Sequence, residues 1–409
     1  MSTVKQRILI LAYYHGLGHV IRSTAAATEL SHRGHDVLFA CSKAAVDIPR
    51  KAGLQCIEIY ELDPIPVSTE DKRSDEPQMA TRPRLANPDY LQQCLREEKK
   101  LIDEFKPDLV LFDFRVTGGV SAALSGVPSM SIFNIQFFEH PMLDIAPNIM
   151  ESLREQAVPE YAIRKFFGDV VVVPDYSQFD PMHRLPNDLV PLIVSNVQEV
   201  RYTGPLLRQY PSELPERQIL KSTLSQHDHL IFVTMGGTSL GFKALKNVLS
   251  GLRGIPTKLV IATGPNIPSR LIEEHIHKIG LRSNAEIEIF EFSDRALEYM
   301  KASDLAIIHG GHTTLMEGIM CGTPLIIAAT QGEQEKNAER VSLLDVGYVL
   351  SAAASLEEQV ADLVPTCLEN EGLRRRCNMV ADSLRTRGTQ DLAEYIEMRA
   401  FKAFKGACR

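Results

Sequence analysis

Short apolar runs alternate with helical patterns along the chain. In the first half, runs rich in Val, Ile, Leu and Phe cover 7–13, 36–41, 55–60, 108–114 and 129–134. Patterns typical of helices separate these runs at 20–31, 44–52, 89–105 and 118–124. Continuous apolar strands separated by helices are typical of a parallel sheet that is covered on both faces. The pattern therefore predicts a doubly wound α/β domain.

The same pattern begins again near residue 229. Strand-like runs follow at 229–237, 258–264, 286–290, 304–311 and 324–329. We predict a first domain over 1–204, a proline-containing linker over 205–218, a second domain over 219–386, and a helix in 387–409 that packs back on the first domain. The predicted fold class is α/β, with two Rossmann-like parallel-sheet domains facing each other across a cleft. Ligands of such sheets bind beyond the carboxyl ends of the strands.

Two segments are less regular. Residues 63–88 contain five prolines and many charges, which favours an exposed loop. Whether this loop is a surface insertion or a substrate lid stays open. Residues 142–167 are predicted to be helical.

Composition narrows the class of protein. Apolar residues make up 44% and charged residues 23% of the 409 positions, which is typical of a globular protein. The net charge of −8 argues against a general nucleic-acid binder. No apolar run reaches the roughly 18 residues that span a bilayer, and the first run lacks a signal-peptide cleavage site. The seven cysteines are scattered without a CxxC pair, which favours the cytoplasm over an oxidising compartment.

The most informative motif begins at His309. This residue ends a predicted strand, and Gly310 and Gly311 then allow close approach of the backbone to a ligand. A predicted helix opens directly afterwards with His312, Thr313 and Thr314. Free N–H groups and the positive end of the helix dipole make such a helix start an anion-binding site. A buried histidine that merely closes the strand is the alternative for His309.

Three further polar residues follow at the same predicted edge. Glu317 lies farther along the helix, where its carboxylate can accept hydrogen bonds from vicinal sugar hydroxyls. Glu333 and Gln334 follow the next strand. Together with the helix start, these residues could hold a ribose, a diphosphate and a hexose in line.

This arrangement resembles the donor-binding signature of the two-domain family-1 glycosyltransferases of GT-B fold, HxGxxSxxE, then P, then DQxxNA. The matching residues are His309, Gly311, Thr314, Glu317, Pro324, Glu333, Gln334, Asn337 and Ala338. The resemblance implies that His309 contacts a donor phosphate, that Gly311, Thr313 and Thr314 cradle the diphosphate, and that Glu317 binds the ribose. It also implies that Glu333 and Gln334 hold the transferred sugar. The donor-binding residues that it implies are Gly236, Gly237, Thr238, Phe292, Ser293, His309, Gly310, Gly311, His312, Thr313, Thr314, Glu317, Glu333 and Gln334.

The chain departs from the family pattern in two places that concern the donor. Glu333 stands where the family usually has Asp, which leaves the choice of sugar open. The chain has no Trp, so the tryptophan on which plant members stack the donor base is missing. The resemblance then assigns base recognition to the backbone around 292–295, as in bacterial members. UDP, dTDP and GDP all stay open as the nucleotide.

A second group of candidate site residues lies where the first predicted strand ends, in the segment YYHGLGHVIRS. A histidine is suited to remove a proton from an acceptor at neutral pH, and a carboxylate on its other ring nitrogen would orient it. The resemblance implies that His19 is this base and that Asp113, at the end of a neighbouring strand, is its partner. His15 is the alternative base. Residues expected to line the acceptor pocket are Gly18, Asn134 and Gln136, with His140 nearby.

Where the family often continues GHxxP, this chain reads GHVIR. In this respect it is similar to lipid-linked peptidoglycan GlcNAc transferases and to some nucleotide-sugar hydrolases. We interpret Arg22 itself as a solvated helix residue.

The function that the resemblance implies is inverting, metal-independent transfer of a hexose from a nucleotide-diphosphate sugar to a small-molecule acceptor. A natural product, as in antibiotic biosynthesis, is the expected acceptor. A nucleotide-sugar hydrolase or epimerase on the same fold, a transferase with a lipid acceptor, and a non-enzymatic nucleotide-sugar binder stay open. A dinucleotide oxidoreductase is disfavoured, because Ile21 stands where GxGxxG needs its third glycine.

No cofactor is expected besides the nucleotide sugar as co-substrate. No DxD motif stands at a strand end, and we interpret His227-Asp228-His229 as a solvated turn, so no metal is predicted. The expected partners are a nucleotide sugar and a small-molecule acceptor, with no nucleic acid and no membrane insertion. Whether the protein forms a homodimer stays open.

Overall fold

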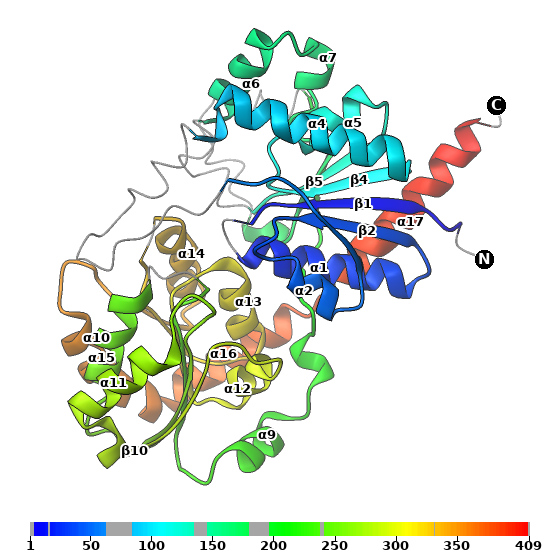
Figure 1. Cartoon of the computed structure of the whole chain (residues 1–409). Helices are drawn as coiled ribbons and strands as arrows, with labels where there is room; N and C mark the ends of the chain where they lie inside the picture. The colour runs from blue at the N-terminus through cyan, green and yellow to red at the C-terminus, as the bar shows by residue number, and fades with distance from the viewer. Residues whose placement is uncertain are drawn as a thin grey trace. The chain divides into compact units, whose positions relative to one another are not determined.

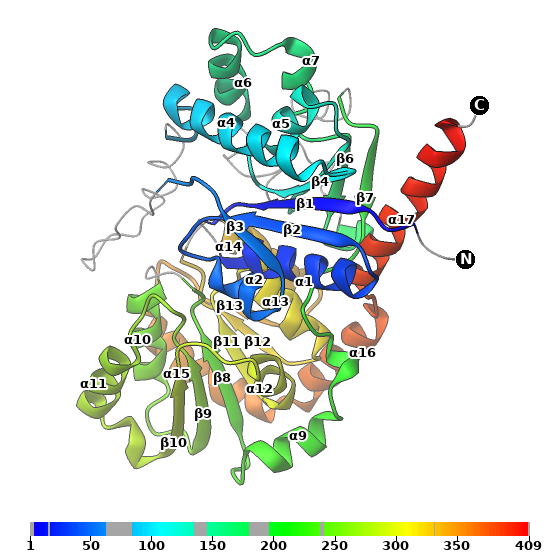
Figure 2. The same cartoon turned by 45° about the vertical axis from the view of Figure 1, so that its right-hand side comes forward.

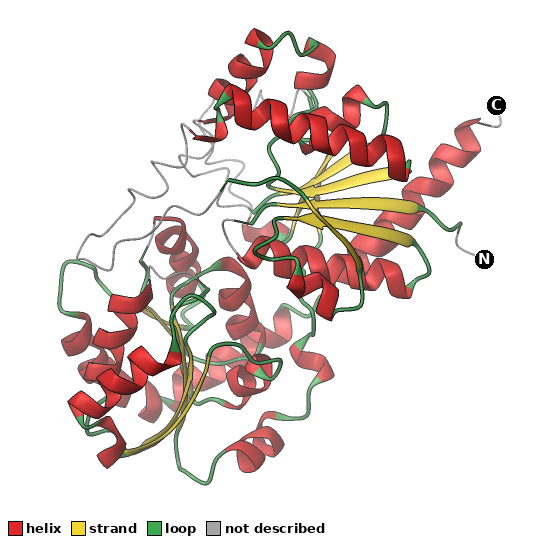
Figure 3. Cartoon of the chain, in the orientation of Figure 1, coloured by secondary structure: helices red, strands yellow, loops and turns green. Residues whose placement is uncertain are grey.

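The computed structural model describes residues 4–14, 17–62, 84–134, 145–179, 196–237, 241–330 and 332–407. These residues form two compact units (Figure 1). Unit 1 contains the described residues up to Arg208 together with those from Thr386 onward. Unit 2 contains the described residues of Gln209–Arg385. In each unit the strands lie between helices (Figure 3), and the predicted α/β class is confirmed.

Unit 1 is built on a sheet of seven parallel strands in the order β3-β2-β1-β4-β5-β6-β7. The strands are β1 Arg7–Ala12, β2 Asp36–Cys41, β3 Gln55–Glu58, β4 Leu109–Asp113, β5 Ser129–Ile132, β6 Val170–Val173 and β7 Glu199–Tyr202. The helices are α1 Leu17–His32, α2 Asp47–Lys51, α4 Pro88–Phe105, α5 Gly118–Leu124, α6 Ile145–Glu155, α7 Glu160–Ile163 and α17 Gly388–Ala407. A single-turn helix, η2, covers Ser177–Phe179.

Side chains of β1 alternate between the two faces of this sheet, as the period of a strand requires. Ile8 and Ile10 are buried in a core with α1 and α17. Leu9 and Leu11 are buried in a second core with α4, α5, α6 and α7. Figure 1 shows α4–α7 on one side of the sheet and α1 with α2 on the other. The continuous apolar run of the sequence therefore reflects burial on both faces.

The C-terminal helix α17 belongs to unit 1. Leu392 and Ile396 are buried in the core that contains α1. Glu397 of α17 lies 3.1 Å from Nη1 of Arg33 and 3.3 Å from Nε2 of His35. The apolar side of the helix therefore faces unit 1, and two basic side chains hold its carboxylate.

Unit 2 repeats the architecture with six parallel strands in the order β10-β9-β8-β11-β12-β13 (Figure 2). The strands are β8 Leu230–Thr234, β9 Thr257–Ala262, β10 Ala285–Phe290, β11 Leu305–Ile308, β12 Leu325–Ile327 and β13 Gly347–Val349. The helices are α9 Arg217–Leu224, α10 Phe242–Gly251, α11 Ser269–Ile279, α12 Ala296–Ala302, α13 His312–Met320, α14 Gly332–Leu343, α15 Leu356–Glu369 and α16 Glu371–Ser383, with single-turn helices η4 Pro211–Glu213 and η6 Leu281–Ser283.

Three short strands have no counterpart in the sequence prediction. These are β6, β7 and β13. The predicted helical segment 142–167 is observed as α6 and α7, as far as the described residues extend. Residues 63–83 of the expected loop or lid lie outside the described residues.

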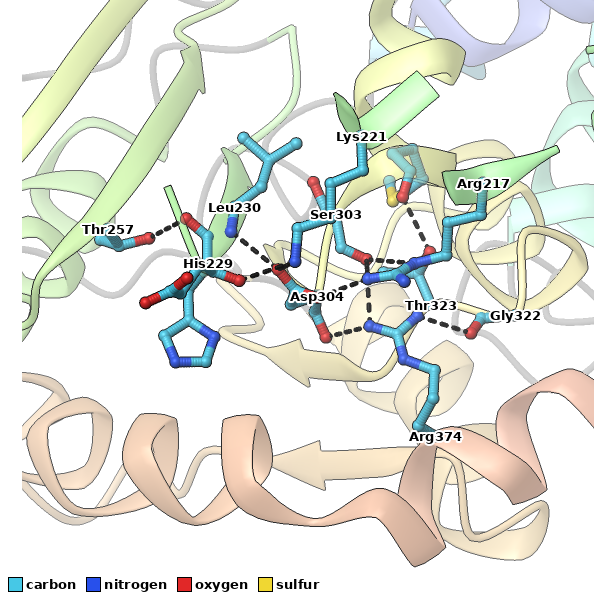
Figure 4. A network of polar contacts seen from close by, with 12 residues as sticks. Arg217, Lys221, His229, Leu230, Thr257, Ser303, Asp304, Gly322, Thr323 and Arg374 are labelled. Atoms are coloured by element: carbon cyan, nitrogen blue, oxygen red, sulfur yellow. Dashed lines mark hydrogen bonds and ion pairs between the residues drawn. The ribbon is translucent and has the colours of Figure 1, made fainter. Parts of the chain in front are cut away.

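A partly buried polar network fixes the amino ends of the central strands of unit 2 (Figure 4). Asp304 precedes β11, and its Oδ2 accepts hydrogen bonds from the Leu230 backbone N–H and from Lys221 Nζ, each at 2.8 Å. Its Oδ1 accepts from Arg217 of α9. Arg374 of α16 donates to the Gly322 carbonyl at 3.2 Å and to the Asp304 carbonyl. The network therefore ties α9 and α16 to strands β8 and β11.

The negative charge of Asp304 contributes to the stability of unit 2. Burial alone raises the pKa of Asp304, but Lys221, the Leu230 N–H and Arg217 outweigh burial and hold the pKa below its usual value. We expect Asp304→Asn to lower the stability of unit 2 by about 2 kcal/mol at pH 7, typical of hydrogen bonds to a charged group. The melting temperature should fall by about 4–8 °C in thermal denaturation.

The stability difference between wild type and Asp304→Asn should depend on pH in a defined direction. A carboxylate whose folded pKa is depressed stabilises above its unfolded value, near 3.9, and loses that effect as the pH falls through the folded value. The difference between wild type and Asp304→Asn should therefore be constant from pH 7 to about 5 and shrink below about 4. The control is Asp345→Asn, which removes a surface ion pair with Arg376 and should change little. A difference that grows in acid would contradict the account.

Candidate functional site

Each sheet has a point at which the strand order reverses. In unit 1 this point lies between β1 and β4, and in unit 2 between β8 and β11. Ligands of open α/β sheets bind outside the carboxyl ends of the strands at such points. His19 follows β1 and Asp113 ends β4, whereas Gly236 follows β8 and His309 follows β11. The main predicted residues therefore lie at the two positions that the topology favours for ligands.

The structure brings His19 and Asp113 into direct contact. His19 lies in the first turn of α1, and its Nδ1 is 2.7 Å from Oδ1 of Asp113. The Asp113 side chain is fully buried, whereas the His19 side chain is 12% exposed. The imidazole stacks on Phe114 with a centroid distance of 5.6 Å and meets Tyr13 edge-on at 6.0 Å. A buried carboxylate thus holds a histidine that keeps access to solvent.

Arg22 completes this cluster, and its interpretation as a solvated residue is wrong. It is 3% exposed. Its Nε and Nη2 donate to Oδ2 and Oδ1 of Asp113, each at 2.5 Å, and its Nη1 donates to Oδ1 of Asn134. Ser23 Oγ donates to Oδ2 of Asp113 at 3.0 Å. The physical reason is that a fully buried carboxylate needs an opposite charge and full hydrogen bonding.

The electrostatics of the cluster favour an ionised Asp113. Burial alone raises the pKa of Asp113, but the guanidinium of Arg22 and the ring of His19 lower it, and the net pKa is below the usual value. An ionised carboxylate only accepts hydrogen bonds. His19 Nδ1 therefore carries the hydrogen that Asp113 accepts, and Nε2 keeps a lone pair that can take a proton.

In unit 2, glycine residues lie against the ring of His309. Gly236 has φ of +81°, and a Cβ atom there would lie 2.6 Å from Nε2 of His309. A Cβ atom at Gly311 would also collide with Nε2 of His309. Asn266, which follows β9, donates from Nδ2 to the Gly237 carbonyl at 2.5 Å. Glycine is therefore required on two sides of the His309 ring.

His309 itself is neutral at physiological pH. Burial lowers its pKa to about 4, against a smaller opposing effect of the Thr234 backbone. Its Nδ1 is buried and has no hydrogen-bond partner among the described residues. Helix α13 begins at His312, and Gly311 occupies its N-cap position. Gly311 supplies no side-chain cap, and the first turn of a helix is a favourable position for an anion.

Residues of α14 support this turn. Asn337 is fully buried, and its Nδ2 donates to the Gly310 carbonyl at 2.9 Å. Gln334 is also buried, and its Oε1 accepts from the backbone N–H and the hydroxyl of Thr330 at 2.8 and 3.0 Å. Glu333 lies half-buried in the first turn of α14. Asn337 thus ties α14 to the Gly310 turn, and Gln334 holds the Thr330 segment that precedes α14.

The other predicted residues are more scattered. Glu317, Thr313 and Thr314 are half-buried on α13, His312 is buried, and Gly18 is exposed in the first turn of α1. Phe292 and Ser293 follow β10, which β9 separates from β8. Phe292 is 52% exposed, and Ser293 Oγ accepts from the Arg295 N–H at 3.1 Å. His15, Gln136, His140 and Thr238 lie outside the described residues.

Comparison with known proteins identifies the class of this fold. Residues 230–392 match the model of the glycosyltransferase family 28 C-terminal domain. A protein of Methanosarcina acetivorans named as an uncharacterized glycosyltransferase is 26% identical over 387 residues, which are 90% of this chain and 92% of that protein. The crystal structure of the glycosyltransferase of kitacinnamycin superimposes with a TM-score of 0.70 at 18% identity, over 97% of this chain and 99% of that one. This chain is a glycosyltransferase of GT-B fold.

A relative with a named pathway is also similar. The PGL/p-HBAD biosynthesis rhamnosyltransferase of Mycobacterium bovis is 22% identical over 422 residues, which cover 94% of this chain and 85% of that protein. The resemblance drawn from the His309 motif is thus confirmed at the level of a GT-B glycosyltransferase. The family model covers the part of this glycosyltransferase that carries that motif.

Sequence reasoning missed the contacts that Arg22 and Asn337 make in the two clusters. Arg22 follows His19 by three positions on α1, a spacing that places both on one helix face. That spacing is the signal that could have found it. Asn337 is part of the matched motif, but its contact with Gly310 has no sequence signal of its own.

Two kinds of feature are absent from the part of the chain that the structure describes. No cluster of three or more His, Cys, Asp or Glu side chains there is placed to hold a metal ion. Among the same residues, no helix combines the length and hydropathy needed to cross a membrane.

Proposed function

We propose that this glycosyltransferase transfers a hexose from a nucleotide-diphosphate sugar to a small-molecule acceptor, with inversion and without a metal ion. The observation that carries this proposal is the arrangement around His309. Gly236 and Gly311 leave no side chain on two sides of its ring, and the N-terminus of α13 begins beside it. Backbone N–H groups and the helix dipole favour a bound diphosphate at such a position.

In this proposal the donor lies along α13. The N–H groups and hydroxyls of Thr313 and Thr314 bind the diphosphate, and the neutral ring of His309 donates a hydrogen bond to it. Glu317 binds the ribose, and Glu333 with Gln334 faces the transferred sugar. These donors take over the stabilisation of the leaving diphosphate that a metal ion supplies in other enzymes.

The transfer step uses the cluster of unit 1. Nε2 of His19 takes the proton of the acceptor hydroxyl while the acceptor oxygen bonds to the anomeric carbon. The bond between that carbon and the diphosphate oxygen breaks, and the electron pair leaves with the diphosphate. Asp113 stabilises the imidazolium that forms, as carboxylates do in other acid–base pairs. Because one displacement occurs at the carbon, its configuration inverts.

We further propose a natural-product acceptor handled in the cytoplasm. The structural neighbour is described as the glycosyltransferase of kitacinnamycin, and the mycobacterial relative as a PGL/p-HBAD biosynthesis rhamnosyltransferase. These descriptions concern those proteins and support the choice of acceptors to be screened. The described cysteines, all free thiols, are compatible with a reducing compartment.

The experiment is a binding screen of UDP-, dTDP- and GDP-hexoses by thermal shift, followed by isothermal titration of the best donor. Glu317→Ala should weaken its Kd by about tenfold, as loss of a charge-assisted hydrogen bond does. The control, Glu335→Ala, removes an exposed carboxylate from α14 and should leave Kd within about twofold. Equal affinities of Glu317→Ala and wild type would refute the ribose assignment, and absence of binding by every nucleotide sugar would refute the proposed function.

A further inference from the structure

The guanidinium of Arg22 lies at the centre of the unit 1 cluster. It contacts both oxygens of Asp113, the Oδ1 of Asn134 and, at 3.0 Å, the Nδ1 of His19. We propose that Arg22 is a positioning residue, which locks the Asp113 carboxylate and Asn134 so that His19 keeps its lone pair on Nε2. This inference rests on the proposed function, because it concerns the base of the transfer reaction.

The distances around Nδ1 of His19 define its hydrogen. Arginine has only donors, and an ionised carboxylate has only acceptors. Nδ1 is 2.7 Å from the Asp113 oxygen and 3.0 Å from Nη2 of Arg22. A lone pair on Nδ1 would point at a negative oxygen at the shorter of these distances, which is repulsive. The hydrogen therefore lies on Nδ1, and the adjacent Nη2 donates to the same Asp113 oxygen.

The paired N–H donors of the Arg22 guanidinium, called the fork below, limit how Asp113 can move. Two parallel N–H donors hold its two oxygens, and bidentate contacts of this kind fix direction as well as distance. Ser23 Oγ occupies a further acceptor position on Oδ2. Oδ1 is thus directed at Nδ1 of His19, whose ring stacks on Phe114. A single cation with one donor direction could not hold both oxygens and Asn134 together.

The fork also connects two strand ends. Asp113 ends β4, and Asn134 follows β5, the next strand of the sheet. Because arginine is the donor in this contact, the Asn134 oxygen faces Arg22 and its Nδ2 group is the donor end of the amide. Asn134 was expected to contact the acceptor. Arg22 therefore fixes the amide of a predicted acceptor residue and the carboxylate that orients the base.

The positive charge of Arg22 has a second effect, which is on the pKa of Asp113. Asp113 is fully buried, and burial alone raises its pKa. The charged or titratable groups that lower the pKa again are Arg22 and His19 of α1. Without Arg22, Asp113 gains a proton at higher pH. A protonated carboxyl can donate to Nδ1, which moves the imidazole hydrogen to Nε2 and removes the lone pair that accepts the substrate proton.

The first test needs no substrate. Protein with ¹⁵N-labelled histidine is titrated by long-range ¹H–¹⁵N correlation NMR, and the His19 signals are assigned by their loss in His19→Ala. We expect the Nδ1–H tautomer in wild type and a mixture of both tautomers in Arg22→Met. The control, Arg33→Met, removes an arginine that directly follows α1 and pairs with Glu29 and Glu397. It should leave the His19 signals unchanged. An unchanged tautomer in Arg22→Met would overturn the proposal.

The second test separates charge from geometry. The donor selected by the binding screen is combined with methyl p-hydroxybenzoate as the probe acceptor, and release of nucleoside diphosphate is followed against pH. Arg22→Met should lower kcat by about 100-fold, with donor KM within twofold, and move the acid limb of the profile up by one pH unit or more. Arg22→Lys keeps the charge, so it should restore the acid limb while kcat stays about tenfold below wild type.

Arg22→Lys keeps the test decisive if Arg22→Met fails to fold, because lysine still neutralises Asp113. A wild-type kcat in Arg22→Lys would overturn the role of the fork, and an acid limb that stays displaced would overturn the role of the charge. The proposed function fails in a different way. It fails if His19→Ala keeps full transfer activity, whatever the Arg22 variants do. Loss of transfer in His19→Ala together with unaffected Arg22 variants refutes this inference alone.

Discussion

His19→Ala is expected to lower kcat for sugar transfer by about 10³-fold, the range that general-base catalysis contributes. The Kd for the nucleotide sugar should stay within about twofold, because the donor is assigned to unit 2 and His19 belongs to unit 1. The fold should persist, since Asp113 keeps its contacts with Arg22 and Ser23. Single-turnover kinetics with the donor from the binding screen, together with isothermal titration, measure both quantities.

The matched control is His32→Ala, which removes an exposed histidine from the last turn of the same helix. It should leave kcat and Kd unchanged. If His19→Ala weakened donor binding as much as it slowed transfer, the residue would bind the donor and would not be the base. If transfer continued at the wild-type rate, His15 would be the next residue to test.

Gly311→Ala is expected to weaken the Kd for the nucleotide sugar by about 10- to 100-fold. The added Cβ atom collides with Nε2 of His309, so the ring or the backbone at the N-cap of α13 must shift. Binding of the diphosphate needs the undistorted arrangement, and restoring it against overpacking costs roughly 1–3 kcal/mol. Each 1.4 kcal/mol of that cost is about tenfold in affinity. Isothermal titration of the nucleotide sugar measures the change, with circular dichroism as a check on the fold.

A second glycine of unit 2 provides the control for this variant. Gly280 ends α11 at φ of +66°, and a Cβ atom there would meet nothing within 4 Å. Gly280→Ala should therefore cost about 1 kcal/mol of stability through backbone strain and leave donor affinity unchanged. Wild-type affinity in Gly311→Ala would show that the diphosphate does not depend on the space beside His309.

The sequence predicted the sheets well where their strands are long and apolar. The strand over 36–41 is observed as β2 with the same bounds, and the helix over 118–124 is observed as α5. β13 is three residues long and β7 has half-buried side chains, so neither has a continuous apolar run. β6 is four consecutive valines, a run too short to separate from a buried helical turn by pattern alone.

The chemistry of the site was predictable where a residue type had one plausible use. His19 with Asp113, and His309 with Gly311, lie where the motifs indicated. Arg22 was not predictable from polarity, because most arginines of a helix are solvated. Its burial follows from the carboxylate of Asp113, which is 91 positions away in the chain. Contacts that depend on such distant partners require the fold.

The central claim is that a diphosphate binds at the start of α13 beside His309. The most direct measurement is a crystal structure of this glycosyltransferase with the nucleoside diphosphate selected by the binding screen. We expect its phosphate oxygens within hydrogen-bond distance of the backbone N–H groups of His312, Thr313 and Thr314. A nucleotide bound elsewhere, with these N–H groups facing only water or protein side chains, would contradict the account.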